Sequence, residues 1–245
     1  HVDRNASPVV DHGDRVVDVD HDLDLMRPGQ SPEDVNSRVL KGVGQVLEVE
    51  RPDVVLVHGD TTTTFAAALA CYYHHIPARH VEAGLRTYDK FRPFPEEMNR
   101  RLADVLCDYH YAPTPMAAEH LRSERISEDH IVVTGNTVID ALLTVREKLG
   151  ETSDLTRSLA GRFPFLREGA RMVLMTGHRR ENFGGGFERI CTAIRTLAER
   201  VPEADFVYPV HLNPNVREPV GRILNGITNV HLIEPLDYLP FVYLM

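Results

Sequence analysis

The amino-acid sequence predicts an α/β protein with two domains, each built on a parallel β-sheet. Short β-branched runs such as Val54–His58 alternate with longer amphipathic stretches, and this alternation is typical of strands joined by helical crossovers. Such connections place helices on both faces of a sheet. A polar, less regular stretch follows Gly150, so we expect an N-terminal domain over residues 1–150, lacking its first strand, and a hinge with the first part of a second domain over 151–245.

The first predicted strand is Val54–His58 (VVLVH), a continuous apolar run that we expect to be buried on both faces. The alanine-rich stretch 61–73 has apolar residues at helical spacing and predicts a helix. Residues 78–82 (ARHVE) predict a shorter strand, which Ala83-Gly84 closes.

The rest of the first domain continues the alternation. Residues 95–106 predict a helix with Pro95 in its first turn, where the missing N–H is tolerated. A brief strand at 110–112 is followed by a helix at 115–122. A strand at 131–134, closed by Gly135-Asn136, precedes a helix at 138–149.

The second domain repeats the pattern. Residues 172–175 (MVLM) predict a strand, and a glycine run then opens a helix at 187–200 with apolar residues on one face. Further strands are expected at 206–210 and 230–233. Ligands of parallel sheets lie at the carboxyl ends of the strands, so polar residues at those ends are the candidates for chemistry.

Composition narrows the function classes. The chain has 245 residues, of which 42% are hydrophobic and 26% charged, as expected for a folded protein. The formal net charge of −9 argues against general nucleic-acid binding. Three distant cysteines without a CxxC pair argue against a zinc site and favour reduced thiols in the cytoplasm. No apolar run reaches the ~18 residues of a membrane span, and no signal peptide is expected.

Two carboxylates follow predicted strands. Asp60 lies in HGDTTTT, where it could cap the next helix or, with the neighbouring hydroxyls, serve a ligand site. Glu82 lies in HVEAGLRT, where it could pair with Arg86 or take part in a site. Position alone leaves both alternatives open.

A third acidic motif is FPEEMNRR. Glu96 and Glu97 occupy the first turn of a predicted helix, where the helix dipole favours negative charge. Arg100 and Arg101 follow about one turn later and could pair with them. Helix stabilisation alone would therefore explain this motif.

Two motifs of the second domain could bind an anion. TGHRRENFGGG combines His178, Arg179 and Arg180 with a glycine-rich turn before a helix, which suits phosphate binding. His211 lies in YPVHLNPNVREP, where it could contact a ligand or stabilise a turn. The sequence contains neither GxSxG nor HExxH, which argues against a serine hydrolase and a zinc peptidase.

Taken together, HGDTTTT, HVEAGLRT, PEEMNR, TGNTVIDALL, TGHRRENFG, YPVHLNPNVREP and LIEPLDYLPF resemble the non-hydrolysing UDP-N-acetylglucosamine 2-epimerases from about Leu25 to Met245. The resemblance implies a GT-B-like fold of two Rossmann-type domains with the active site between them. It implies interconversion of UDP-GlcNAc and UDP-ManNAc, for cell-envelope polysaccharide synthesis, without NAD or a metal. UDP is eliminated to leave 2-acetamidoglucal and is then added back. The family resemblance also implies a cytoplasmic homodimer in the full-length form, with no membrane or nucleic-acid partner.

The resemblance also assigns roles to residues. It implies that Asp60, Glu82 and Glu96 are the acid/base carboxylates and that His178 contacts the UDP leaving group. The other expected contacts, to the diphosphate and the nucleotide, are Arg179, Arg180, His211 and Phe241, the last near the uracil.

Departures from the family pattern qualify these expectations. The first 24 residues follow it poorly, and we expect the chain to begin after the GTRPE-type loop and to end before the Asp-Ser-Gly-Gly-type loop. We therefore expect this chain by itself to bind UDP weakly and to turn over poorly or not at all. The alternatives are a GT-B glycosyltransferase, an inactive nucleotide-sugar-binding fragment, and, as a closer relative, a hydrolysing epimerase.

Overall fold

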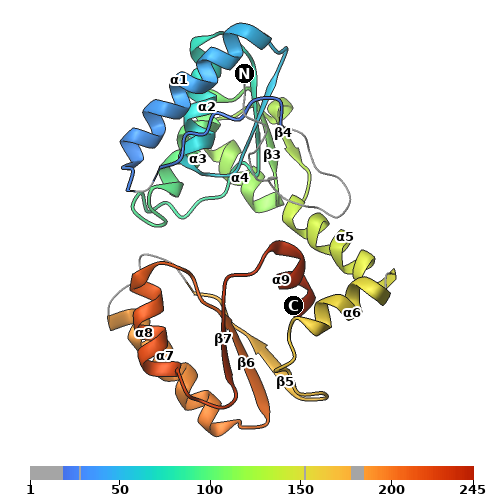
Figure 1. Ribbon diagram of the computed structural model, residues 1–245. Coiled ribbons are helices and arrows are strands. Elements are labelled where there is room, and N and C mark those ends of the chain that lie inside the picture. Colours follow the sequence, from blue (N-terminus) through green and yellow to red (C-terminus); the bar gives the residue numbers. More distant parts are fainter. Residues whose placement is uncertain (1–18, 28, 152, 178–184) are drawn as a thin grey trace. The chain divides into compact units, whose positions relative to one another are not determined.

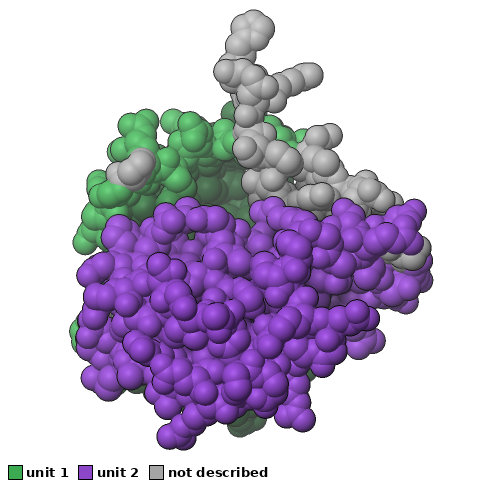
Figure 2. Space-filling view, turned by 60° about the horizontal axis from the view of Figure 1, so that its bottom comes forward, with its two compact units in different colours: residues 1–9, 17–140 green, residues 10–16, 141–245 purple. Residues whose placement is uncertain are grey.

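The computed structural model describes residues 19–27, 29–151, 153–177 and 185–245. They fall into two compact units, one ending at Asp140 and the other running from Ala141 to Met245, coloured separately in Figure 2. The division lies inside helix α5 (Thr137–Glu151). The domain boundary after residue 150 stays a prediction.

The first unit, unit 1, contains a four-stranded parallel sheet whose strands lie side by side in chain order. Figure 1 shows its strands β1 (Val55–His58), β2 (Ala78–Val81), β3 (Tyr109–Ala112) and β4 (Ile131–Val133), and its helices α1 (Pro32–Glu50), α2 (Thr62–Tyr73), α3 (Glu96–Leu106) and α4 (Pro115–Ser123). A 3₁₀ turn at Glu128–His130 precedes β4. The predicted strand–helix alternation is confirmed, and each crossover returns the chain in parallel.

Only one face of this sheet is covered by described helices. Val57 and His80 lie on that face and are 5% and 0% exposed, because α2, α3 and α4 pack over it. The other face leaves Leu56 64% and Val132 45% exposed. The expectations that β1 is buried on both faces and that helices cover both faces are therefore wrong for the described part of unit 1.

Helix α1 was not expected from the sequence, although its start carries a capping box. Ser31 accepts a hydrogen bond from the Asp34 N–H, and the Asp34 side chain accepts one from the Ser31 N–H. Its buried residues include Val39 and Leu47, and the helix packs on α2.

The second unit, unit 2, contains a three-stranded parallel sheet in the order β5-β6-β7. Its strands are β5 (Arg171–Leu174), β6 (Ala204–Pro209) and β7 (Val230–Ile233), and its helices besides most of α5 are α6 (Ser153–Gly161), α7 (Gly185–Arg200), α8 (Pro214–Leu224) and α9 (Tyr238–Leu244) (Figure 1). Helix α6 occupies the stretch that was expected to be irregular, and α8 and α9 were not expected either.

Strand β6 is buried on both faces. Phe206 and Tyr208 pack with residues of α7 and α8 on one face, whereas Val207 packs with Phe163 and Leu244 on the other. In unit 2 the predicted coverage of both sheet faces is thus confirmed. Among the described residues, no helix is both long and apolar enough to cross a membrane.

Candidate functional site

Asp60 lies in the turn between β1 and α2. Gly59 adopts φ +75°, which favours glycine, and donates its N–H to the carbonyl of Val81 at 3.0 Å. The cap of α2 is Thr61, whose Oγ1 accepts a hydrogen bond from the Thr64 N–H. The interpretation of Asp60 as the helix cap is therefore wrong. Its carboxylate instead pairs with Arg100, with Oδ2 2.8 Å from Nη2.

Glu82 lies at the end of β2 in a strained conformation. Its φ of +70° is left-handed, which costs a non-glycine residue about 1 kcal/mol. The Glu82 N–H donates to the Tyr111 carbonyl at 3.0 Å, and the carboxylate Oε2 lies 3.2 Å from His58 Nε2. Pairing with Arg86 does not occur, because Arg86 contacts Asp104 and Glu124.

The sheet register brings Asp60 and Glu82 onto adjoining turns. His58 is the register partner of Val81, so the residues that follow the two strands are neighbours. A Cβ built on Gly59 would lie 3.8 Å from Glu82 Oε2. The Asp60 and Glu82 side chains are 34% and 29% exposed. Both carboxylates are thus reachable by a ligand while each is held by a basic partner.

The first turn of α3 docks against the Asp60 turn. Asn99 donates its side-chain N–H to the Asp60 carbonyl at 3.0 Å, and Arg100 Nε donates to the Glu96 carbonyl at 3.4 Å. The Glu96 side chain is partly exposed, and its carboxylate has no polar partner among the described residues. The third candidate carboxylate therefore lies on a segment that directly contacts the first.

Glu97 has a different role from its neighbour. It is 0% exposed, and its two carboxylate oxygens accept the backbone N–H groups of Thr87 and Tyr88 at 3.1 Å each. Arg100 Nε lies 3.8 Å from Glu97 Oε2. Glu97 thus anchors the loop that precedes α3.

Asp104, which sequence reasoning did not single out, is the centre of a buried network. Its Oδ2 accepts from Arg86 Nη2 at 2.7 Å and from the Gly84 N–H at 3.3 Å, and its Oδ1 lies 2.5 Å from His80 Nδ1. Burial raises the pKa of Asp104, but hydrogen bonds and charges from His80 and Arg86 outweigh it and hold this pKa below its ordinary value. A signal was present in the sequence: Glu97, Arg100 and Asp104 recur at helical spacing on one face of α3.

In unit 2, the predicted residues His178, Arg179 and Arg180 lie outside the described part of the chain. His211 follows β6, and its Nδ1 accepts a hydrogen bond from the Asn213 N–H at 3.1 Å. Asn213 in turn caps α8. The turn-stabilising interpretation of His211 is thus observed, and its ligand contact stays a prediction.

Phe241 lies on α9 and lines a hollow of about 380 Å³ in unit 2. Thr176, which follows β5, lines the same hollow, together with Met172, Leu174, Leu244 and Met245. The structure therefore brings the strand end that precedes His178 together with the aromatic side chain expected near the uracil.

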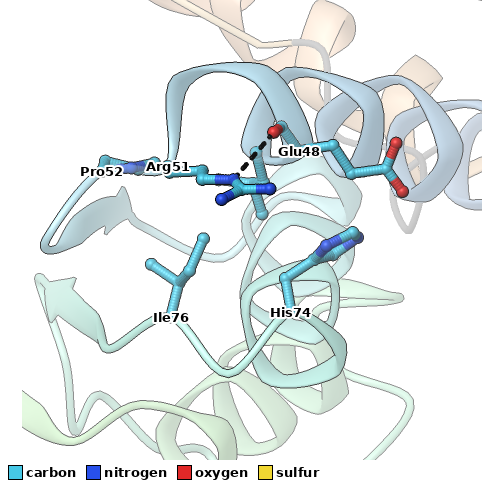
Figure 3. A pocket seen from close by; sticks show the side chains of 6 residues that line it. Glu48, Arg51, Pro52, His74 and Ile76 are labelled. Atoms are coloured by element: carbon cyan, nitrogen blue, oxygen red, sulfur yellow. Dashed lines mark hydrogen bonds between the residues drawn. The ribbon is translucent and has the colours of Figure 1, made fainter.

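Another hollow, of about 370 Å³, lies in unit 1 (Figure 3). Its lining residues include Arg51, Pro52, His74 and Ile76, and Arg51 Nε donates to the Glu48 carbonyl at 3.4 Å. Pro52 precedes β1 and Ile76 precedes β2, so this hollow lies at the amino ends of the strands. Asp60 and Glu82 follow the carboxyl ends of the same strands, so this hollow is not part of the candidate site.

Comparison with known proteins identifies one family model and relatives that cover most of the chain. The sequence model of the UDP-N-acetylglucosamine 2-epimerase family matches residues 1–245, further toward the amino terminus than the motif resemblance reaches. A UDP-N-acetylglucosamine 2-epimerase of Yersinia pestis is 58% identical over 226 residues, which cover 92% of this chain and 60% of the relative. The UDP-N-acetylglucosamine 2-epimerase of Escherichia coli K12 is 52% identical, and the match again covers 92% of this chain and 60% of the relative. The chain thus spans about 60% of the length of the curated relatives it matches.

Among solved structures, UDP-GlcNAc 2-epimerase from Neisseria meningitidis bound to UDP-GlcNAc matches with a TM-score of 0.90 and 50% identity, over 93% of this chain and 61% of that one. The predicted GT-B-like α/β class, with a parallel sheet in each unit, is confirmed. On the match of the family model along its entire length, this chain belongs to the UDP-N-acetylglucosamine 2-epimerase family.

Proposed function

We propose that the intact protein interconverts UDP-GlcNAc and UDP-ManNAc by elimination and re-addition of UDP, and that unit 1 supplies its acid/base groups. The observation that carries this proposal is the pair of accessible carboxylates on adjoining strand ends, Asp60 with Arg100 and Glu82 with His58. Inversion at C2 needs proton transfer at a carbon that is not acidic, which positioned carboxylates can provide. The relatives' names, and the UDP-GlcNAc bound to the Neisseria enzyme, support the proposal that UDP-GlcNAc is the substrate.

Asp60 and Glu82 contact different basic side chains, and we assign them different roles in proton transfer. Arg100 Nη2 lies 2.8 Å from Asp60 Oδ2 and orients this carboxylate, and we assign Asp60 as the group that accepts a proton. Glu82, whose Oε2 lies 3.2 Å from His58 Nε2, is assigned as a second group for proton transfer. Glu96 is the third acid/base group, on the turn that docks against Asp60.

Unit 2 would hold the leaving group. His178, Arg179 and Arg180 are cations or hydrogen-bond donors suited to a departing diphosphate. Phe241 supplies an apolar wall in the hollow beside Thr176, which suits a uracil ring, and His211 contributes from the end of β6. The reaction as proposed takes no NAD and no metal.

Proton exchange with the solvent tests the proposal. The chain is joined to the flanking segments of the Neisseria relative, so that it has the relatives' length, and is incubated with UDP-GlcNAc in heavy water. Proton NMR should show deuterium at C2 of both epimers. Asp60→Asn should abolish incorporation, whereas the control Asp53→Asn, at an exposed residue before β1, should leave it unchanged.

Each alternative outcome has a distinct product. Incorporation that continues at the same rate in Asp60→Asn contradicts the site assignment. Transfer of the sugar to an acceptor without C2 exchange indicates a glycosyltransferase, and free ManNAc with UDP indicates a hydrolysing enzyme. Binding without exchange indicates a nucleotide-sugar-binding protein.

A homodimer in the cytoplasm is the second part of the proposal. Helix α3 leaves Leu102 38% and Val105 80% exposed, and Tyr72 and Tyr73 of α2 are also exposed. Exposed apolar side chains in a group are typical of protein interfaces. Light scattering of the extended chain should give twice the chain mass, and Val105→Glu should shift it toward the monomer; a monomeric parent protein would contradict the proposal.

A further inference from the structure

His80 is a buried histidine whose two ring nitrogens both face acceptors. It lies on β2 and is 0% exposed. Nδ1 is 2.5 Å from Asp104 Oδ1, and Nε2 is 2.7 Å from the carbonyl oxygen of Gly59. An ionised carboxylate and a carbonyl oxygen can only accept hydrogen bonds. Both contacts are therefore hydrogen bonds only when both nitrogens carry a proton, as in the imidazolium.

The charges around His80 can support a buried cation. Asp104 is in direct contact with it, and Arg86 Nη2 lies 2.7 Å from both Asp104 Oδ2 and Glu124 Oε2. A protonated His80 and Arg86 thus match two carboxylates, which offsets the cost of burying them. Arg101 approaches Glu124 at 3.9 Å, but it is 40% exposed and screened by water.

A second buried histidine offers a matched comparison. His110 on β3 is the register partner of His80 and is 2% exposed. Its Nε2 lies 2.8 Å from the Asp104 carbonyl, whereas its Nδ1 has no hydrogen-bond partner within the described ranges. Of the two ring nitrogens of His110, only Nε2 faces an acceptor in the described part of the chain. The two histidines share depth and sheet face and differ in their acceptors.

We propose that His80 is a positioning residue, held as an imidazolium, that ties the Gly59 carbonyl and the turn carrying Asp60 to Asp104 on α3. Asp104 also accepts the Gly84 N–H, so one buried carboxylate is connected to the turns that follow both β1 and β2. The role of His80 in the reaction rests on the proposed function. The charge of His80 and its hydrogen bond to the Gly59 carbonyl are independent of that function.

Nitrogen NMR of the 245-residue chain tests the charge. Long-range proton–nitrogen spectra, which distinguish protonated from unprotonated ring nitrogens, are recorded of ¹⁵N-histidine-labelled protein at a single pH of about 8. His80→Gln and His110→Gln assign the signals, and correlation of each ring with its own backbone assigns them if a variant fails to fold. His80, whose two ring nitrogens both face acceptors, should show two protonated nitrogens, and His110 should show one. An unprotonated nitrogen on His80 overturns the proposal.

Amide hydrogen exchange of the same chain tests the positioning. A glutamine side chain carries both of its N–H groups on one nitrogen. In His80→Gln it can therefore donate to only one of the two acceptors, which lie on opposite sides of the histidine ring. The Gly59 N–H should exchange about tenfold faster in His80→Gln, as expected for loss of a charge-assisted bond. His110→Gln should leave the Gly59 and Asp60 signals in place. Unchanged Gly59 exchange in a folded His80→Gln protein overturns the positioning role, whatever the result of the deuterium test at C2.

Discussion

Glu97→Gln removes one acceptor from a carboxylate that is completely buried. In the native protein both Glu97 oxygens accept backbone N–H groups, from Thr87 and Tyr88. A glutamine keeps one of these bonds and turns an amide NH₂ toward the other N–H. A hydrogen bond to a charged group contributes about 1.5–3 kcal/mol, and an unsatisfied buried donor adds a similar cost. We therefore expect a loss of about 2–4 kcal/mol in the free energy of unfolding of unit 1.

The adjacent carboxylate provides the control for this prediction. Glu96→Gln makes the same chemical change one residue earlier, at a partly exposed side chain without a described polar partner. It should change the free energy of unfolding by less than about 0.5 kcal/mol, as is usual for surface substitutions. Under the proposed function, Glu96→Gln should nevertheless reduce C2 deuterium incorporation, because Glu96 is assigned to proton transfer.

Urea unfolding followed by circular dichroism measures the difference, since the chain has no tryptophan for fluorescence. Amide hydrogen exchange of the Thr87 and Tyr88 N–H groups shows whether the loss of stability arises in the loop before α3. Equal stability of the two variants, or slow exchange of both amides in Glu97→Gln, would refute the reasoning from the Glu97 hydrogen bonds.

Two further predictions concern acid stability and unit 2. The folded-state pKa of Asp104 is depressed, so its contribution is fully present above the unfolded value of about 4 and is lost as the pH falls through the lower folded value. Urea midpoints measured at decreasing pH should fall in this window, and Asp104→Asn, already less stable at neutral pH, should show a shallower decline; an identical decline would contradict this. In unit 2, the Asn229 side-chain amide donates to the carbonyls of Ala198, Val201 and Ala204. Asn229→Ala should lower the free energy of unfolding by about 2–3 kcal/mol, whereas Asn225→Ala at an exposed position should be nearly neutral, and equal midpoints in urea would argue against the network.

Much of the fold followed from local patterns. Strands such as Val230–Ile233 and the parallel order of the sheets could be predicted, because β-branched runs and helical crossovers have few alternative arrangements. The helix at Ser153–Gly161 could not, because it is polar and Leu159 is its buried apolar residue. A short helix of this kind is specified by the surface it packs on more than by its own periodicity.

In helix α3 the hydrophobic pattern predicts the wrong face as the buried one. Its polar residues Glu97, Arg100 and Asp104 are buried, while Leu102 and Val105 face solvent. Hydrophobic periodicity assigns the apolar stripe to the core. Here the inward face is polar because its partners, Asp60, His80 and backbone N–H groups, come from other segments.

The sequence by itself determined the α/β class, the family, and the placement of Asp60 and Glu82 at strand ends, since these follow from the order of residues along the chain. Only the tertiary structure decided the partners of those carboxylates. Arg100 rather than a helix amide holds Asp60, and His58 rather than Arg86 holds Glu82. The tertiary structure also decided the contacts of Asp104, which is buried and connected to the turns that follow β1 and β2. The physical reason is that the state of a carboxylate depends on burial and on the charges within a few ångströms, and residues distant in the chain supply both.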